Sequence, residues 1–153
     1  MLKEVSMKKS MMAKTVIVVF LLLAINVSFS HTQLLLGEDA QVVVTLKDET
    51  VYTFEYGSFN LNWTALRVKD ELNCTYTDFE PEMIKDIFVM GMTWNSCDKK
   101  DDRLFDVNLG KRSYQGFCPL SDDKVTGKLL DTGEEKSIPY EDIKKISFAG
   151  KPE

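Results

Sequence analysis

Side chains with catalytic or metal-binding chemistry are few and widely spaced in this sequence. It contains three cysteines, Cys74, Cys97 and Cys118, and one histidine, His31. The cysteine spacing matches no CxxC metal or redox motif, which favours a structural role. An N-terminal His31 would offer copper its amine and imidazole, but such a site needs a second histidine, which the sequence lacks. A Ser-His-Asp triad would have to use His31 as its base.

One carboxylate stands in a pattern that is typical of an enzyme. Leu129-Leu130-Asp131-Thr132-Gly133 resembles the hydrophobic-Asp-Thr-Gly motif of aspartic proteases. In that family a flap and a second hydrophobic-glycine element follow the motif, and only 20 residues follow Gly133 here. A hairpin turn explains the same residues, because glycine readily adopts a positive φ. We expect the turn, and a secreted hydrolase with carboxylate chemistry around Asp131 is the alternative function.

Residues 1–30 have the order of regions found in a secretory signal peptide. A lysine-rich start precedes an apolar run at residues 15–27, and Ser28-Phe29-Ser30 supplies small residues where signal peptidase cleaves. The run is shorter than the roughly 20 residues that span a bilayer. We therefore expect cleavage after Ser30, a periplasmic or secreted protein, and no stable membrane anchor after cleavage.

The charge of the remaining sequence is acidic. Residues 1–30 carry four Lys and one Glu, so 15 of the 19 basic and 23 of the 24 acidic residues remain, a formal charge of −8. This charge disfavours nucleic acid as a partner. In an oxidising compartment we expect Cys97 to pair with Cys118, because the two flank a predicted linker and hairpin, and Cys74 to stay unpaired.

The sequence after residue 30 contains an internal echo. Residues 44–54 align with 107–117, sharing Val, Leu and Phe at the same spacing, and residues 84–91 align with 143–150 through Ile-x-x-Ile and a final glycine. Two matches in the same order indicate a degenerate duplication. Each copy is predicted to hold short strands, one helical turn after a proline, and a closing strand. Residues 93–104 are polar and charged and form the predicted linker.

This succession of strands, one turn and a closing strand, Ile143-x-x-Ile146-x-Phe148, resembles small SH3-like β-barrel modules of bacterial envelope proteins. The resemblance implies a mostly β fold, with SH3-like units at residues 31–92 and 105–153 in tandem or as one continuous β-sandwich. It also implies binding of a protein or glycan and no catalysis. Side chains at equivalent positions of the two copies should be buried alike: Ile84, Ile87, Ile143, Ile146, Phe54 and Phe117.

Aromatic side chains are the remaining candidates for a binding site. Trp94 in the predicted linker is the best candidate for an exposed functional aromatic, Tyr56 and Tyr114 are further ligand-binding candidates, and Trp63 is expected in the core. The predicted function is an exported, non-catalytic binding or structural module for a protein or glycan of the cell envelope, with no cofactor, no metal ligand and possible homo-oligomerisation. A carboxylate pair with displaced pKa values would favour the hydrolase, whereas an exposed sheet edge would favour the binding module.

Overall fold

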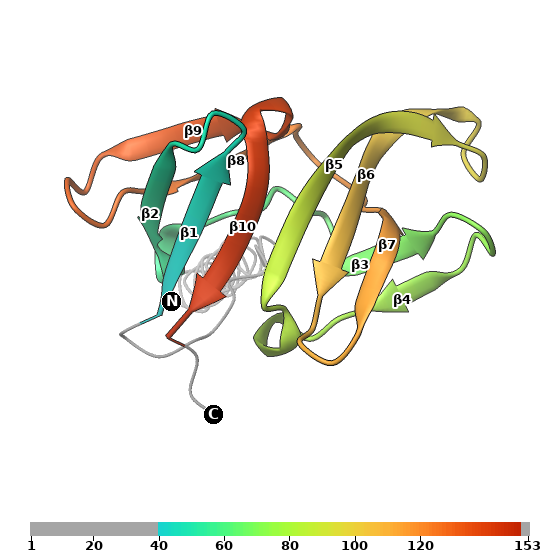
Figure 1. Ribbon diagram of the computed structural model, residues 1–153, viewed down its shortest axis with the longest axis horizontal. Coiled ribbons are helices and arrows are strands. Elements are labelled where there is room, and N and C mark those ends of the chain that lie inside the picture. Colours follow the sequence, from blue (N-terminus) through green and yellow to red (C-terminus); the bar gives the residue numbers. More distant parts are fainter. Residues whose placement is uncertain (1–39, 151–153) are drawn as a thin grey trace, which may run out of the picture. The chain divides into compact units, whose positions relative to one another are not determined.

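The computed structural model describes residues 40–150, which form antiparallel strands joined by turns and by short 3₁₀ helices (Figure 1). The strands are β1 (Gln41–Leu46), β2 (Val51–Glu55), β3 (Arg67–Asp70), β4 (Tyr76–Asp78), β5 (Asp86–Asn95), β6 (Lys100–Asn108), β7 (Ser113–Phe117), β8 (Lys124–Lys128), β9 (Glu135–Pro139) and β10 (Ile143–Ala149). The 3₁₀ helices are η1 (Tyr56–Ser58), η2 (Pro81–Met83) and η3 (Tyr140–Asp142). The predicted signal peptide lies outside the described residues, and in residues 40–150 no helix is long and apolar enough to cross a membrane.

The strands belong to one large and one small sheet. Eight strands follow the order β2-β1-β10-β5-β6-β7-β3-β4, and β8 pairs with β9 alone. The predicted mostly β fold is therefore confirmed. The sheets are open at their ends, however, and the predicted tandem SH3-like barrels are not confirmed.

Strand pairing mixes the two predicted copies of the repeat. β1 pairs with β10, and Phe54 in β2 bridges to Leu129 just after β8. β6 and β7 pair instead with β5 and β3, which belong to the first copy. We name β1, β2, β8, β9, η3 and β10 the split half, and β3, β4, η2, β5, β6 and β7 the continuous half. Each half thus combines strands from both copies.

The two halves meet where β5 pairs with β10. Ile87 lies opposite Ile146, and these are equivalent residues in the predicted repeat. The flanking pairs are reciprocal. Asp86 lies opposite Ser147, and Phe88, the repeat equivalent of Ser147, lies opposite Lys145, the repeat equivalent of Asp86. Such reciprocal pairing is the pattern of a twofold interface, here within one chain.

One hydrophobic core runs through both halves. The predicted burial is confirmed for all four isoleucines and for both phenylalanines: Ile84, Ile87, Ile143, Ile146, Phe54 and Phe117. Trp63 is also buried, as expected, with its ring 5.5 Å from that of Phe105 in β6. The ring of Phe105 lies 5.2 Å from that of Tyr140 in η3, and the Tyr140 hydroxyl donates a 2.6 Å hydrogen bond to the Leu61 carbonyl. These contacts join η3 of the split half to β6 of the continuous half.

Residues 93–104 differ from the sequence prediction. The predicted linker is the end of β5, a tight turn and the start of β6, with pairs from Thr93↔Asp102 to Asn95↔Lys100. The segment is polar because many side chains at this tip of the hairpin are exposed, so it lacks the alternation that marks a half-buried strand.

Candidate functional site

The most unusual feature of the described residues is the outer part of β5. Its pairing with β10 ends at Phe88, while its pairing with β6 continues to Asn95. The register shifts between Val89 and Gly91, so Met90 is an extra residue in β5, and Gly91 takes a φ of 116°. A bulge of this kind bends a strand away from its neighbour. Residues 90–95 therefore form an edge that no described strand covers, which we call the free edge of β5.

The free edge is apolar. Met90, Met92 and Trp94 are 55%, 59% and 57% exposed. No charged residue occurs from Ile87 to Asn95. Proteins usually protect a sheet edge with charges, proline or a covering segment, because its unpaired N–H and C=O groups can bind another strand. Beyond its bulge, this edge has neither a charge nor a proline from Met92 to Asn95, so it is suited to receive another strand.

A disulfide holds the hairpin that carries this edge. Cys97, in the β5–β6 turn, is bonded to Cys74, in the β3–β4 turn, with the two Cα atoms 5.5 Å apart. The predicted pair of Cys97 with Cys118 is therefore wrong, since Cys118 is free and buried. Pairing of β3 with β7 brings the two turns together, and this long-range contact is not visible in the sequence.

Polar contacts of the β5–β6 turn fix it further. The side-chain oxygen of the buried Asn95 accepts hydrogen bonds from the backbone N–H groups of Cys97 and Asp98, at 3.0 and 3.1 Å. Its amide nitrogen donates to the carboxylate of Asp98 at 3.1 Å. Asp98 also accepts a 2.6 Å bond from Lys69 in β3, and this bond holds the pKa of Asp98 below its ordinary value. These contacts thus hold the turn in one conformation.

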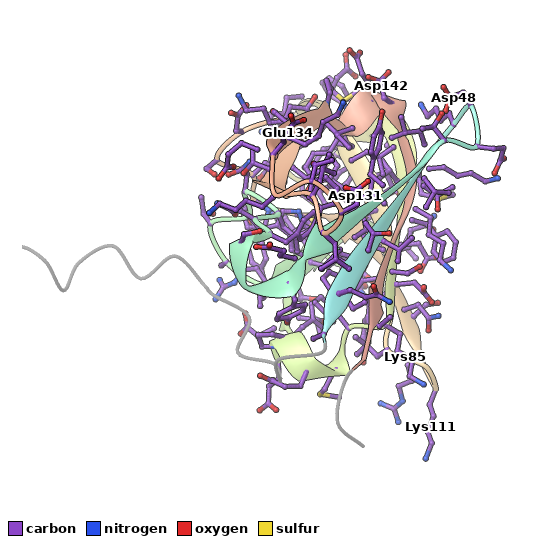
Figure 2. All side chains as sticks on the ribbon, turned by 90° about the vertical axis from the view of Figure 1, so that its left-hand side faces the viewer. Asp48, Lys85, Lys111, Asp131, Glu134 and Asp142 are labelled. Atoms are coloured by element: carbon purple, nitrogen blue, oxygen red, sulfur yellow. A yellow bond between two sulfur atoms is a disulfide. The ribbon has the colours of Figure 1, made fainter. Side chains whose placement is uncertain are left out.

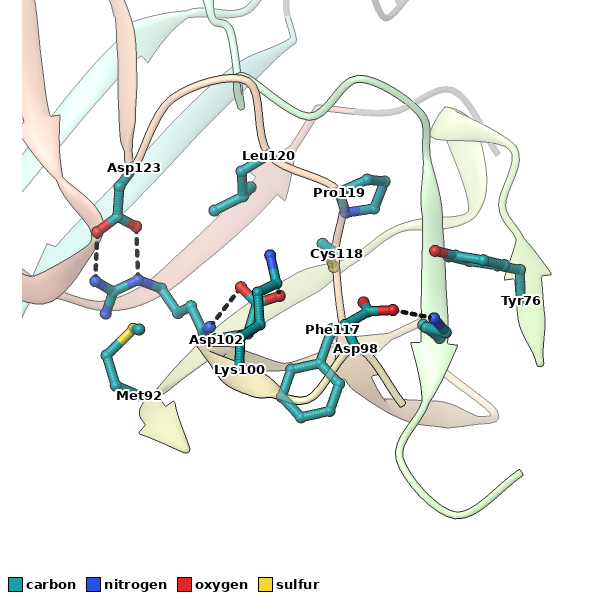
Figure 3. Close-up of a pocket in the computed structure, with 12 residues that line it drawn as sticks. Tyr76, Met92, Asp98, Lys100, Asp102, Phe117, Cys118, Pro119, Leu120 and Asp123 are labelled. Atoms are coloured by element: carbon teal, nitrogen blue, oxygen red, sulfur yellow. Dashed lines mark hydrogen bonds and ion pairs between the residues drawn. The ribbon is translucent and has the colours of Figure 1, made fainter. Parts of the chain in front are cut away.

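Behind the hairpin lies a pocket of about 510 Å³ (Figure 3). Its cations are paired: Arg103 donates two hydrogen bonds to Asp123 at 2.7 and 2.6 Å, Lys100 lies 3.2 Å from Asp102, and Lys69 bonds Asp98. Burial raises the pKa of the Cys118 thiol, which disfavours the nucleophilic thiolate. Residues 40–150 contain no group of three or more His, Cys, Asp or Glu side chains placed to hold a metal ion. The pocket is therefore a network of satisfied ion pairs.

The three predicted ligand-binding aromatics lie in different surroundings. Trp94 is exposed on the free edge. Tyr56, in η1, is buried with its ring 6.3 Å from Phe148, and Tyr114, in β7, packs 5.3 Å from Phe79. Trp94 and Tyr114 lie opposite β6 residues 101 and 107, about 20 Å apart along the strand. The structure does not bring the three into one surface.

Asp131 lies in an exposed turn between β8 and β9. Gly133 has a φ of 70°, and its N–H bonds the Leu129 carbonyl at 2.8 Å, as in a tight hairpin turn. The shallow pocket beside it is lined by Gln41, Val51, Tyr52, Thr53, Leu129, Leu130 and Asp131. Asp131 is the only carboxylate among these lining residues, so the paired carboxylates of a hydrolase are not assembled in this pocket.

No protein-family model, no curated protein and no solved structure matches this chain.

Sequence reasoning selected Trp94 but missed Met90 and Met92. All three alternate in an uncharged stretch that runs past Gly91, the glycine equivalent to Gly150 in the predicted repeat. This continuation of an apolar alternation beyond the repeat was the available signal. Its exposure could not be predicted, because the sequence does not show where β10 stops covering β5.

Proposed function

We propose that the protein is an exported, non-catalytic binding module that holds an extended segment of a partner protein on the free edge of β5. The observation that carries this proposal is the uncharged edge at residues 90–95, which pairs with no described strand on its outer side and has three exposed apolar side chains. A segment that adds a strand there gains main-chain hydrogen bonds, and the exposed side chains provide selectivity.

A protein segment fits this edge better than a glycan does. Six residues of strand extend about 20 Å and turn alternate backbone groups outward at a regular spacing. Another extended peptide matches that spacing along its whole length. A glycan has no equivalent ladder of donors and acceptors, so it would use only the exposed side chains.

The alternative, a secreted hydrolase around Asp131, receives less support. Asp131 is exposed in a turn and has no second carboxylate among the residues that line its pocket. Hydrolysis by paired carboxylates needs two groups in one cleft whose environments separate their pKa values. The free edge lies away from this turn, in the part of β5 that pairs with β6 alone.

The proposal includes export of the protein from the cytoplasm and descent of its two halves from SH3-like units. The order of regions in residues 1–30 and the Cys74–Cys97 disulfide both support work outside the cytoplasm, in the periplasm or beyond. Each half combines two hairpins, a 3₁₀ turn and a closing strand, which supports descent from SH3-like units that have exchanged strands.

Site-specific photocrosslinking in the producing cells tests the function. A photoreactive side chain replaces Trp94 in one variant and Val51 in a control, because Val51 is equally exposed, at 56%, in β2 of the split half. We expect the variant at position 94 to form an adduct with a protein, and mass spectrometry to place the contact on an extended segment of it. The control should not form this adduct.

Two results would overturn the proposal. Adducts only with a second copy of this chain would make the edge a self-association surface. Adducts with glycan alone, or equal adducts from positions 94 and 51, would show that the edge does not select a protein segment.

A further inference from the structure

Acidic side chains lie along both sides of the free edge of β5. Asp101 in β6 lies directly opposite Trp94. On the other side, η3 lies against β5 and carries the exposed Glu141 and Asp142. Glu141 is near enough to Arg103, the residue opposite Met92, to contribute to the raised pKa of that guanidinium, whose largest cause is its hydrogen bond to Asp123.

These acids differ from the acids of the neighbouring pocket. Asp98, Asp102 and Asp123 each have a cation within hydrogen-bonding or ion-pair distance. Asp101, Glu141 and Asp142 form no side-chain ion pair with any residue of the described part. Their charge is therefore not neutralised by a paired cation.

The cations beside Asp101 and Glu141 are already paired with other acids, whereas Lys47, whose backbone N–H bonds the Asp142 carbonyl at 2.9 Å, lies beside Asp142. Arg103 and Lys100 are held by Asp123 and Asp102. Lys99 lies in the β5–β6 turn, beyond the last residue of the free edge. In Figure 2, Asp142 lies toward the same end of the described residues as Asp48, Asp131 and Glu134, whereas Lys85 and Lys111 lie toward the opposite end. An incoming segment thus approaches through a negative field.

We infer that the partner segment is basic: an extended stretch in which apolar residues and Lys or Arg lie on the same face. This inference rests on the proposed function and specifies the partner of the same edge. The apolar residues contact Met92 and Trp94, and the cations share their face, because Asp101, directly opposite Trp94, lies on the same side of the sheet as Trp94. Complementary charge of this kind raises the rate of encounter and excludes acidic segments.

Two synthetic peptides test the inference on the intact protein. Both carry the same apolar residues at some positions of one face, and one has Lys and the other Glu at the remaining positions of that face. Titration calorimetry at low and high salt measures both affinities. We expect the Lys peptide to bind at least tenfold more tightly at low salt, and the preference to shrink with added salt, which screens charges beyond about 10 Å at 0.1 M.

Two variants assign the binding to the residues named. Asp101→Asn/Glu141→Gln/Asp142→Asn should reduce the Lys preference to about twofold, because the attracting charges are gone. Met92→Ser/Trp94→Ser should abolish binding of the Lys peptide without a change of charge. Its control is Val51→Ser/Leu130→Ser, two exposed apolar residues of the split half and its β8–β9 turn, which should bind as the unchanged protein does.

The outcomes separate the inference from the function. If the Glu peptide binds as tightly as the Lys peptide, and Met92→Ser/Trp94→Ser abolishes both, the edge binds peptides but the basic partner is wrong. If neither peptide binds, or if Met92→Ser/Trp94→Ser has no effect, the proposed function itself fails.

Discussion

The closing strands of the two predicted copies, β5 and β10, begin alike and end differently. Their isoleucines are equivalent and buried, and each alignment ends at a glycine with positive φ, 116° at Gly91 and 74° at Gly150. β5 then continues to Asn95, whereas Gly150 is the last described residue of the other copy. Val89 is the last residue of β5 in the hydrophobic core, so the continuation of β5 past Gly91 contributes mostly surface. This difference makes the continuation of β5, rather than the end of β10, the surface on which the proposed function depends.

A second difference is how the two halves are fastened. In the split half, Phe148 at the end of β10 packs with its ring 6.3 Å from Tyr56 and 6.4 Å from Phe59. The equivalent position in β5 is Val89, beside the bulge, and the strand beyond it has no such aromatic cover. The Cys74–Cys97 disulfide lies in the continuous half alone and holds the extended hairpin. The end of β10 is thus held by aromatic packing, whereas the hairpin at the end of β5 is held by the disulfide.

The largest expected effect comes from the isoleucines that face each other between the halves. Ile87→Ala and Ile146→Ala should each reduce the free energy of unfolding by about 2–5 kcal/mol, because each leaves a cavity in a fully buried site. Both variants should unfold in a single transition in urea, monitored by fluorescence and far-UV circular dichroism, since strands from both copies share one core.

Independent units would behave differently. Two separate transitions, with Ile87→Ala moving one and Ile146→Ala the other, would contradict the exchange of strands between the copies. The m-value distinguishes these cases, because it scales with the surface exposed in each transition.

The disulfide should have the next largest effect. Cys74→Ala/Cys97→Ala should lower stability by about 3 kcal/mol, the value expected for closing a loop of this size. Thiol counting in denaturant without reductant should find one free thiol, and peptide mapping should place it on Cys118. A free thiol on Cys74 would restore the pairing of Cys97 with Cys118 and contradict the geometry of the hairpin.

A smaller, pH-dependent effect is expected at the junction of the halves. Burial raises the pKa of Asp86, but hydrogen bonds from Lys145 and Ser147, both 2.8 Å, outweigh it and leave the pKa below its ordinary value of 3.8. Because the folded pKa is lowered, this stabilisation is present above pH 3.8 and is lost as the pH falls through the lowered value.

Asp86→Asn isolates this contribution. The variant should be less stable by about 1 kcal/mol at pH 7 and should lose less stability on acidification than the unchanged protein. Equal acid sensitivity of the two proteins in urea titrations at pH 7 and pH 3 would show that the Asp86 contacts do not hold β5 against β10.

The smallest effect on stability is expected at the free edge. Met92→Ser/Trp94→Ser should change the free energy of unfolding by no more than about 0.5 kcal/mol, because exposed side chains outside the core contribute little. Val51→Ser/Leu130→Ser should be equally neutral. A loss of several kcal/mol in the first variant alone would mean that Met92 and Trp94 support the fold. It would contradict the claim that β5, unlike β10, continues as surface beyond the core.

Local features of the fold were predictable from the sequence. Alternating apolar residues predicted many of the strands, though not those of residues 93–104, and Pro81 and Pro139 predicted turns that the structure shows as η2 and η3. The Ile-x-x-Ile spacing predicted burial of four isoleucines, because it places both residues of each pair on the side that packs inward. These features depend on neighbouring residues, which a sequence displays directly.

The pairing of strands was not predictable in the same way. Two similar copies offer each strand two chemically similar partners, so alternation alone does not decide whether β1 pairs with β5 or with β10. The cysteine pairing depends on the strand pairing, because Cys74 reaches Cys97 only when β3 lies beside β7. Of the free edge, the sequence indicated only Trp94. The exposure of Met90 and Met92 could not be predicted without knowing where the pairing of β10 with β5 ends.

Amide hydrogen exchange, with and without the Lys peptide, tests the central claim most directly. In the unbound protein, alternate amides of residues 90–95 should exchange fast, because they face no strand, while amides of β10 stay protected. The peptide should slow those edge amides at least tenfold and leave β10 unchanged. Uniformly slow exchange along β5 in the unbound protein, or protection by the peptide elsewhere in the chain, would contradict the assignment of this edge as the binding site.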